Sequence, residues 1–541
     1  MATITNQRLT NLRALVIDDM ATMRQNVRTQ LGELGIGHID QAATPDEAIN
    51  HIRRDGYDII ICDYNLNRET NGQQLLEFLR SQNLLSPATM FIMVTAEAAY
   101  DLVASAAEFQ PDAYMVKPLT GGKLLERIER LLDKQNILRP IVSRLKLKDV
   151  IGAVAECDRI LQAAPKWALD ILKIKGNALL ELGKPEEASV VYSQALMVRD
   201  DLAWAKLGIA TCHQIAGKLE EAKSAAQGVL TNNAKYIPAY DLLVKVAEAQ
   251  GNEQEALNAL NQSYEVIPSA RRSRMVGDVA YRTGDLEQAR TAFSRALNHT
   301  KGSLTAQPSD MLSLAQVHVD AGEPTLALQV LSTAPKHYAE SNAFVATQAA
   351  VQAQAHIKLG DSDAAEKAYT LAKTMVDSTK ADASALALAK AAFSIGREEE
   401  GAQILSQAVR ADHENSRLVS LARKVLKDTG KEDLAERIVD HALNEVNTIV
   451  AEANALMRKA QFDESLAKLD EALNAMPENT GVLLAAAQLH LLWMSQKGLN
   501  LDYVAKVNNY LSKLDALMPG NERVSKMYRF LRETLSRAKK G

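Results

Sequence analysis

The chain has 541 residues, which is too long for one ordinary hydrophobic core and predicts at least two folded units. Hydrophobic residues at 47% and charged residues at 24% are near the globular average, and they exclude a mostly disordered, collagen-like or membrane-embedded chain. The 62 Lys and Arg against 67 Asp and Glu give a net charge of −5, which lacks the basic excess of a nucleic-acid binder.

The cysteines and the N-terminus indicate a reducing compartment. Cys62, Cys157 and Cys212 are too far apart for a metal clip, and an odd number favours buried, reduced thiols over a disulfide framework. The first ten residues are polar and lack the apolar core of a secretory leader, and no run of about 18 apolar residues occurs. We therefore expect a cytoplasmic protein without membrane insertion.

Short apolar runs rich in β-branched residues alternate with helical patterns between residues 14 and 132. Because the runs are continuous rather than alternating, they predict strands that are buried on both faces of a parallel sheet. Five βα units in about 120 residues predict a small doubly wound α/β domain. The predicted strands are Ala14–Asp19, His38–Ala42, Asp58–Asp63, Thr89–Thr95 and Ala113–Pro118.

From residue 134 onward the sequence is all-helical in pattern, with Ala, Leu, Glu, Lys and Gln dominant. No flexible linker separates the two parts. Residues 132–148 are themselves helical in pattern and interrupted only by Pro140, so we expect a stiff connection.

The helical part repeats with a period of about 34 residues. Gly183, Gly217, Gly251 and Gly284 are separated by 34, 34 and 33 residues, and an alanine follows each one five residues later. This spacing predicts helical hairpins, each with a turn glycine at positive φ and a small residue where the two helices cross. Less regular units continue through Gly322, Gly360, Gly396 and Gly430, and a further unit has Ala460 before its second helix.

The repeat resembles the tetratricopeptide repeat (TPR). One unit matches that consensus at Gly176, Leu179, Gly183, Ala188, Tyr192 and Ala195. The unit around Gly217 departs from it, because Trp204, Leu207 and Gly208 come about two residues early, which suggests a longer or rotated first helix. The resemblance implies an α-solenoid of about nine TPR-like hairpins that binds other proteins, closed by a capping helix over Glu522–Lys540.

We place the domain boundaries where these patterns change. The expected parts are an α/β domain (1–133), a helical connection with an opening half-repeat (134–168), TPR-like repeats (169–520) and a C-terminal capping helix (521–541).

Acidic residues gather at one predicted edge of the sheet. Asp18 and Asp19 close the first strand and Asp63 closes the third, so their carboxylates should meet where ligands bind in doubly wound sheets. Mutually repelling carboxylates of this kind suit Mg²⁺. Thr95 and Lys117 end two further strands and add a hydroxyl and an ammonium. Flanked by two cations, a carboxylate can act as a nucleophile toward a phosphoryl group, which predicts an aspartyl phosphate on Asp63.

With these residues in order, the segment resembles the receiver domain of two-component response regulators, with a flavodoxin-like (CheY-like) fold. The resemblance implies that Asp63 is the phosphoacceptor, Thr95 the switch hydroxyl and Tyr114 the switch aromatic, with a cis bond between Lys117 and Pro118. It implies Mg²⁺ held by Asp19, Asp63 and the backbone carbonyl of Asn65, with Asp18 acting mainly through water. The loop departs from the family, because Asn67 replaces the usual proline and Gly72 comes one residue late.

One candidate binding surface lies in the repeats. Arg271, Arg274 and Arg282 occupy positions that the TPR family places on its concave face, and we interpret them as a basic strip for an acidic partner segment. The alternative is a solvated charged face without a ligand.

These observations predict a two-component signalling protein that is not itself a metabolic enzyme. A histidine kinase or phosphotransfer protein would phosphorylate Asp63 with Mg²⁺, and the TPR array would bind an unknown protein partner. The alternative is a phosphate sink or an inhibitor, with the array gripping a kinase or a rival regulator. The net charge and the lack of a helix-turn-helix pattern disfavour a transcription factor, and the repeats offer no catalytic constellation.

Overall fold

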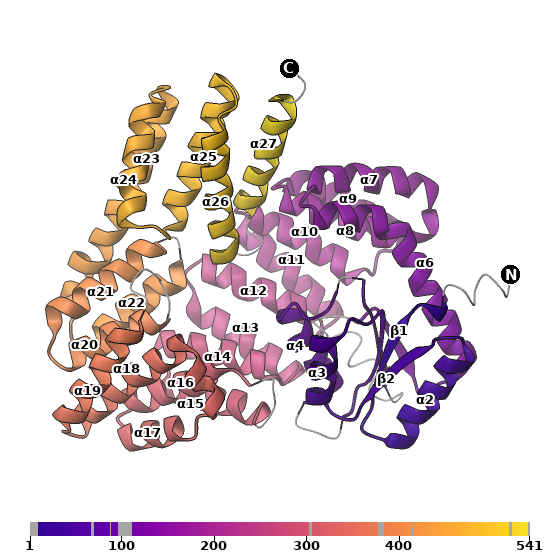
Figure 1. Cartoon of the computed structure of the whole chain (residues 1–541), viewed down its shortest axis with the longest axis horizontal. Helices are drawn as coiled ribbons and strands as arrows, with labels where there is room; N and C mark the ends of the chain where they lie inside the picture. The colour runs from indigo at the N-terminus through magenta and orange to yellow at the C-terminus, as the bar shows by residue number, and fades with distance from the viewer. Residues whose placement is uncertain are drawn as a thin grey trace. The chain divides into compact units, whose positions relative to one another are not determined.

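The computed structural model describes residues 9–66, 70–86, 88–95, 111–301, 306–376, 383–413, 415–518 and 522–538. The chain forms two compact units. The first consists of Met1–Val279 with Ser294–Gln307, and the second of Ala280–Phe293 with Pro308–Gly541. Each unit is described by itself below (Figure 1).

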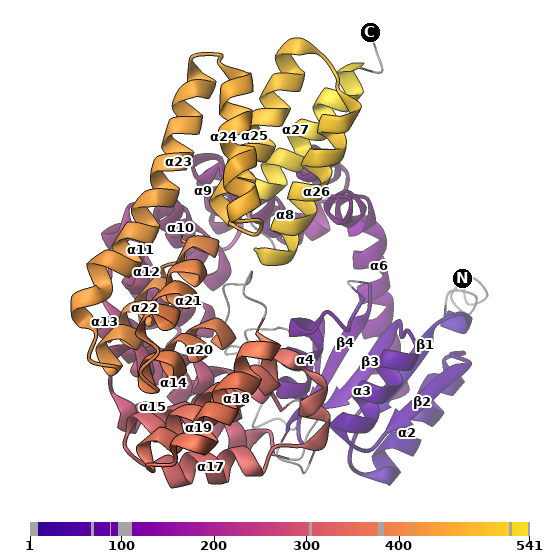
Figure 2. The same cartoon turned by 60° about the vertical axis from the view of Figure 1, so that its left-hand side comes forward.

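The first unit opens with a five-stranded parallel sheet in the order β2-β1-β3-β4-β5, which is the flavodoxin-like order. Figure 2 shows β2, β1, β3 and β4 side by side in this order. The predicted doubly wound α/β domain is therefore confirmed. Its elements are β1 (Arg13–Ile17), α2 (Ala21–Glu33), β2 (His38–Ala42), α3 (Pro45–Arg54), β3 (Ile59–Asp63), α4 (Gly72–Ser81), β4 (Met90–Thr95), β5 (Ala113–Val116) and α6 (Gly121–Lys146).

Helices cover both faces of this sheet. Apolar residues of α2 and α6 form one core with alternate strand residues, and those of α3 and α4 form a second core on the opposite face. The strands β3 and β4 are buried at every position, as continuous apolar runs require. The loops at the carboxyl ends of the strands are therefore the part of this domain that is available for a functional site.

The connection to the repeats is a single helix. α6 spans 26 residues and continues through Pro140, so the boundary predicted at residue 133 lies inside it. A rigid helical connection rather than a flexible linker follows from this continuity.

The remainder of the first unit consists of antiparallel helix pairs. All three cysteines of the chain are free and buried, as predicted. The helices are α7 (Val150–Ala163), α8 (Ala168–Glu181), α9 (Pro185–Val198), α10 (Ala203–Ile215), α11 (Leu219–Asn232), α12 (Ile237–Ala249) and α13 (Glu253–Val266), with a 3₁₀ turn at Pro165–Trp167. The division between the units passes through α14 (Ala270–Thr283) and α15 (Leu286–His299).

The second unit continues the helix pairs to the C-terminus. Among the described helices, none combines the length and apolar character that a membrane crossing requires. The helices are α16 (Pro308–Asp320), α17 (Pro324–Ser332), α18 (Asn342–Lys358), α19 (Ser362–Met375), α20 (Ala383–Ser394), α21 (Glu398–Ala411), α22 (Ser416–Asp428), α23 (His441–Arg458), α24 (Phe462–Ala475), α25 (Thr480–Lys497), α26 (Leu501–Leu517) and α27 (Glu522–Ala538), with a 3₁₀ turn at Lys336–Glu340.

The repeat logic is confirmed at the turns and crossings. Each predicted turn glycine has a positive φ, and the small residue five positions after it is buried in every one of these units except that of Gly430, where Ala435 is half-buried. The turn glycines are Gly183, Gly217, Gly251, Gly284, Gly322, Gly360, Gly396 and Gly430.

Two units differ from the expectation. The helix that contains Gly208, α10, has only 13 residues, so it is not lengthened as expected. The ring of Tyr192 packs against Gly208 instead, and it also packs against Gly176. A Cβ at either glycine would approach that ring to 2.7 Å or 2.5 Å. After Gly430 a 3₁₀ turn (Glu432–Leu434) and a π-helical turn (Glu436–Asp440) lead directly into α23, so the second helix of that unit is not separate.

Ala460 occupies the position of the turn glycine in the unit that lacks one, with φ of 59°. The left-handed conformation disfavours any residue with a Cβ, so Ala460→Gly should raise the free energy of unfolding by about 1 kcal/mol. The control is Gly360→Ala, at a turn glycine where φ is 80° and a Cβ would contact nothing. This variant should have a free energy of unfolding that is lower by a similar amount. Urea denaturation of both variants tests this, and a destabilised Ala460→Gly protein would contradict it.

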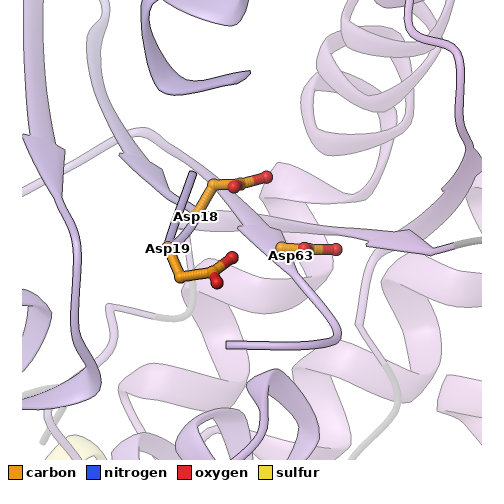
Figure 3. Close-up of side chains that lie close together, drawn as sticks. All are labelled: Asp18, Asp19 and Asp63. Atoms are coloured by element: carbon orange, nitrogen blue, oxygen red, sulfur yellow. The ribbon is translucent and has the colours of Figure 1, made fainter. Parts of the chain in front are cut away.

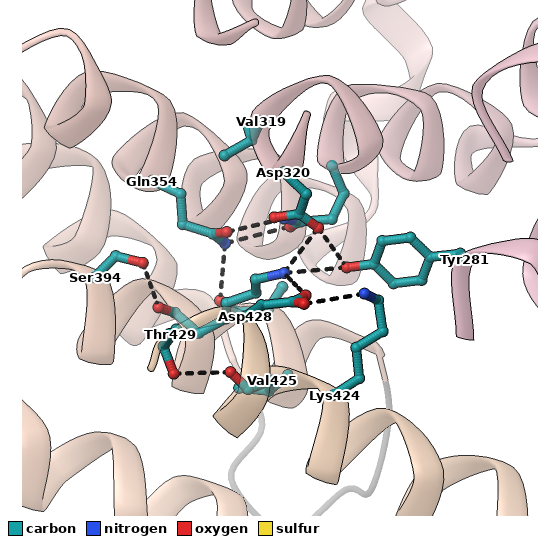
Figure 4. A network of polar contacts seen from close by, with 12 residues as sticks. Tyr281, Val319, Asp320, Gln354, Ser394, Lys424, Val425, Asp428 and Thr429 are labelled. Atoms are coloured by element: carbon teal, nitrogen blue, oxygen red, sulfur yellow. Dashed lines mark hydrogen bonds and ion pairs between the residues drawn. The ribbon is translucent and has the colours of Figure 1, made fainter. Parts of the chain in front are cut away.

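A buried charge network joins four helices of the second unit (Figure 4). Lys390 of α20 is 4% exposed, and its Nζ lies 2.8 Å from Asp320 of α16 and 2.6 Å from Asp428 of α22. The Tyr281 hydroxyl of α14 donates to Asp320 at 2.7 Å, and Lys424 approaches Asp428 at 3.0 Å. Two lysines and two aspartates thus balance their charges across helices from three repeats, and Tyr281 adds a helix from a fourth, which stabilises their relative positions.

His490 of α25 is buried between the rings of Tyr503 and Tyr510. Its Nδ1 lies 2.8 Å from the Ala486 carbonyl, and within the described chain Nε2 is buried without a hydrogen bond. Burial lowers the pKa of His490, and nearby Lys506 lowers it further, against the opposing effects of the Ala486 carbonyl and Asp470. The imidazole is therefore held neutral.

Folding of the second unit should weaken in acid because of His490. As the pH falls below about 6.5, the unfolded chain binds a proton that the folded protein still rejects, so the free energy of unfolding falls by up to about 1.4 kcal/mol per pH unit. Urea denaturation between about pH 5 and pH 8 measures this slope. His490→Phe should reduce the slope, whereas His337→Phe, at an exposed position, should leave it unchanged. Equal slopes in all three proteins would contradict the assignment.

Candidate phosphoryl-acceptor site

Three carboxylates meet at the carboxyl edge of the sheet. Asp18 and Asp19 directly follow β1, and Asp63 ends the neighbouring strand β3. One oxygen from each lies within 4.8 Å of the others (Figure 3). Asp18 and Asp63 are each only 6% exposed, so their negative charges are crowded in a poorly solvated place. The edge predicted from the strand pattern therefore brings these three residues together.

Lys117 contacts this cluster from the loop after β5. Its Nζ lies 2.9 Å from Oδ2 of Asp63 and 3.3 Å from Oδ2 of Asp18. Its backbone N–H donates to the carbonyl of Thr95 at 3.0 Å, and Thr95, the last residue of β4, is 1% exposed. The Lys117–Pro118 peptide bond is cis, as expected. The ammonium is thus held directly against the carboxylate that sequence reasoning named as the acceptor.

Burial and charge set the protonation of this pair. Burial raises the pKa of Asp63, Asp18 raises it further, and the hydrogen bond and charge of Lys117 oppose this rise. Burial by itself would lower the pKa of Lys117, but the hydrogen bonds and charges of Asp63 and Asp18 outweigh it and raise that pKa. Lys117 therefore stays cationic beside a carboxylate whose charge is poorly solvated.

The backbone around the acidic pair is fixed by a residue that sequence reasoning missed. Arg24 of α2 donates from one guanidinium nitrogen to the carbonyls of Asp18 at 2.7 Å and Asp19 at 3.0 Å. The N–H of Met20 donates to Oδ1 of Asp18 at 2.8 Å. The sequence offered one signal for this role, a basic residue on the first helix about one turn after the acidic pair. Spacing in the sequence does not show that the Arg24 side chain reaches back to the carbonyls of that pair.

Gly72 lies against the backbone of Asp63. A Cβ at Gly72 would be 2.2 Å from the Asp63 carbonyl oxygen, and its N–H donates to the carbonyl of Tyr64 at 2.8 Å. Only glycine fits this close approach at the first position of α4. Gly72, which comes one residue later than in the receiver family, thus packs directly against the backbone of Asp63.

The donor set of this edge fits a divalent cation. In their ionised forms Asp18, Asp19, Asp63 and Lys117 leave two negative charges in excess, and hard carboxylate oxygens are what Mg²⁺ binds. Within the described ranges this is the one group of at least three metal-ligating side chains of this kind. Asn65, whose backbone carbonyl was predicted as a ligand, follows β3 in an exposed position.

The α/β domain is similar to proteins of known family. Residues 14–129 match the family model of the response regulator receiver domain. Over 125 residues, 23% of this chain, the sequence is 31% identical to the chemotaxis protein CheY of Pseudomonas aeruginosa, of which 99% is covered. The chain belongs to the response regulator receiver family. Its receiver domain is also 28% identical over 124 residues to chemotaxis protein CheY-3 of Vibrio cholerae, covering 94% of that protein and 23% of this chain.

The repeats following the receiver domain match a second family model. Residues 200–309 match a tetratricopeptide repeat-like domain. A tetratricopeptide repeat protein from Parabacteroides merdae of known structure is 13% identical, covering 51% of this chain and 98% of that one with a TM-score of 0.29. The two family models identify the chain as a receiver domain joined to TPR-like repeats.

Two predicted features of the receiver domain have different outcomes. Tyr114 lies on β5 opposite Met93 and is half-buried against the core on the α3 and α4 side; its switch role remains a prediction. Asn67, where the sequence departs from the family, lies outside the described residues.

The three arginines of the predicted basic strip fall in different surroundings. Arg271 and Arg274 line a pocket of about 270 Å³ in the first unit, whose other wall is α4 of the receiver domain. Arg282 lines a separate cavity of about 560 Å³ in the second unit, next to Arg423, Lys424 and Lys427 of α22. The structure therefore places the strip at two pockets, and its binding role remains a proposal.

Proposed function

We propose that this protein is a phosphorylation-dependent response regulator in which Asp63 accepts a phosphoryl group and the TPR-like repeats deliver the output. The observation that carries the proposal is the contact of Lys117 Nζ with Asp63 at 2.9 Å inside a cluster of three carboxylates. The phosphodonor would be the phosphohistidine of a histidine kinase or of a phosphotransfer protein.

The arrangement supports attack by an Asp63 oxygen on phosphorus. The new bond joins an Asp63 oxygen to phosphorus while the bond from phosphorus to the donor's imidazole nitrogen breaks, and its electron pair returns to the ring. Lys117 would stabilise the negative charge on the transferring oxygens. Mg²⁺, held by Asp18, Asp19, Asp63 and the Asn65 carbonyl, would neutralise part of that charge.

The output of this chemistry would be a change in protein binding. Phosphorylation converts the singly charged Asp63 carboxylate into an acyl phosphate of about two negative charges, so it adds about one negative charge and three strong acceptor oxygens at the edge where Thr95 and Lys117 lie. Thr95 would donate to those oxygens, and its movement would bias the face that carries Tyr114. No nucleic-acid contact is part of the proposal.

Incubation with acetyl phosphate tests the chemistry. The purified protein should gain the mass of one phosphoryl group with Mg²⁺ present and none when a chelator removes it. Intact-mass spectrometry measures this. A protein that gains no phosphoryl group at any Mg²⁺ concentration would overturn the proposed function.

A further inference from the structure

We infer that the second compact unit binds a small ligand that carries a phosphate group, in the cavity of about 560 Å³ between the end of α14 and the end of α22. This cavity is separate from the carboxylate edge of the receiver domain, and the inference does not depend on phosphorylation of Asp63. Its walls come from repeats that are far apart in the sequence, so neither one repeat nor a pair of neighbouring repeats could form it.

Positive charge dominates the lining of this cavity. Four basic and two acidic side chains line it, so the lining carries a net charge of +2. The basic residues are Arg282 on the α14 wall and Arg423, Lys424 and Lys427 on the α22 wall, and the acidic residues are Asp428 and Glu432. A phosphate monoester carries about two negative charges at neutral pH, so its charge complements that of the lining.

The cations of the α22 wall are crowded. Arg423 and Lys427 are four residues apart, so they lie on the same face of the helix and repel one another. Arg423 pairs with Asp440 but its side chain stays 45% exposed. Lys427 is exposed and has no ion-pair partner among the described residues. An anion in the cavity would relieve this repulsion through charge-assisted hydrogen bonds.

The buried network beneath the cavity holds its two walls together. Nζ of Lys424 lies 4.6 Å from the ring centroid of Tyr281 on α14 and 3.0 Å from Asp428 on α22 (Figure 4). Lys390 Nζ lies 2.6 Å from the same Asp428 and 3.1 Å from the Tyr281 hydroxyl. The walls are therefore positioned before a ligand binds, which lowers the entropic cost of binding.

The cavity suits a compact phosphate ester better than an extended peptide. Its volume is within the range of small-molecule sites. Guanidinium groups present parallel N–H donors that match two phosphate oxygens, and arginines from both walls line the cavity. Leu286 and Ala435 add apolar surface for the organic part of the ligand.

Isothermal titration calorimetry of the full-length protein with phenyl phosphate tests the site, at constant ionic strength and with EDTA present. Benzoate is the matched probe, with the same ring and a single negative charge. Phenyl phosphate should bind saturably to one site and about tenfold more tightly than benzoate. Without a divalent ion, the carboxylate edge of the receiver domain has two negative charges in excess and should repel the same probe.

Substitutions on the two walls locate the site. Lys427→Gln and Arg282→Gln each remove one charge from opposite walls, and each should weaken phenyl phosphate binding about five- to tenfold. Lys431→Gln is the control, because Lys431 pairs with Glu398 at 2.6 Å and does not line the cavity. Its affinity should change less than about twofold. Thermal unfolding verifies that each variant is folded.

Any of four results would overturn the inference. Phenyl phosphate that shows no saturable binding, or binds no better than benzoate, would exclude a phosphate site, and hexaglutamate that binds in its place would indicate a peptide surface. A loss in Lys427→Gln without a loss in Arg282→Gln would place the site on α22 alone. An equal loss in Lys431→Gln would indicate unspecific attraction. If Arg282→Gln does not fold, Thr283→Glu, at an exposed position of the same wall, should weaken binding instead.

Discussion

Asp63→Asn protein should take up no phosphoryl group from acetyl phosphate, because an amide oxygen lacks the negative charge that makes the carboxylate a nucleophile. The substitution preserves the shape of the side chain and an acceptor for Lys117, which lies 2.9 Å away in the native protein. Intact-mass spectrometry should show label at the background level, while the wild-type protein is labelled.

Asp58→Asn is the matched control for this prediction. Asp58 lies at the opposite end of β3, where its carboxylate accepts the N–H of Arg13 at 2.8 Å, an interaction that an amide oxygen can keep. Labelling should therefore remain near the wild-type level. If Asp63→Asn protein were labelled as fully as wild type, the acceptor would be a different residue.

Lys390→Ala should destabilise the second unit by about 3–5 kcal/mol, the cost of leaving buried carboxylates without their cation. Asp320 and Asp428 have side chains that are 8% and 18% exposed, so water compensates little for the lost ammonium. Hydrogen exchange measured on peptides from α16, α20 and α22 should accelerate in the variant, since these helices share the network.

Two further variants define the cause. Lys431→Ala removes a lysine from an exposed pair with Glu398 and should cost about 1 kcal/mol or less. Combining Lys390→Met with Asp320→Asn and Asp428→Asn removes the Lys390 ammonium together with both carboxylates that it contacts, and should recover part of the lost stability. If Lys390→Ala costs no more than Lys431→Ala, the network does not stabilise the unit.

The acceptor site could be predicted because each of its residues is next to a strand end. Asp63 closes a continuous apolar run, and Asp18 and Asp19 follow another, so a parallel sheet brings them to one edge whatever the loops do. Arg24 was missed for the converse reason. Its contacts are to backbone carbonyls, which any sequence offers and no pattern marks.

The repeats show the same contrast. The period of about 34 residues predicted the turns, because positive φ demands glycine and the residue type records the conformation. No residue type in the sequence indicates that the helices after Gly430 merge. Alanine at position 460 likewise does not indicate the positive φ found there.

The sequence by itself determined the α/β domain, its carboxylate edge and the helical repeats. These features follow from local rules that connect residue type to backbone conformation and to burial. Only the tertiary structure decided which side chains from distant parts of the sequence meet. Lys390 finds Asp320 and Asp428 at separations of 70 and 38 residues, and Glu77 meets Arg271 across two different domains. Such contacts depend on how each helix is rotated and stacked against its neighbours, which small shifts in packing decide and residue order does not record.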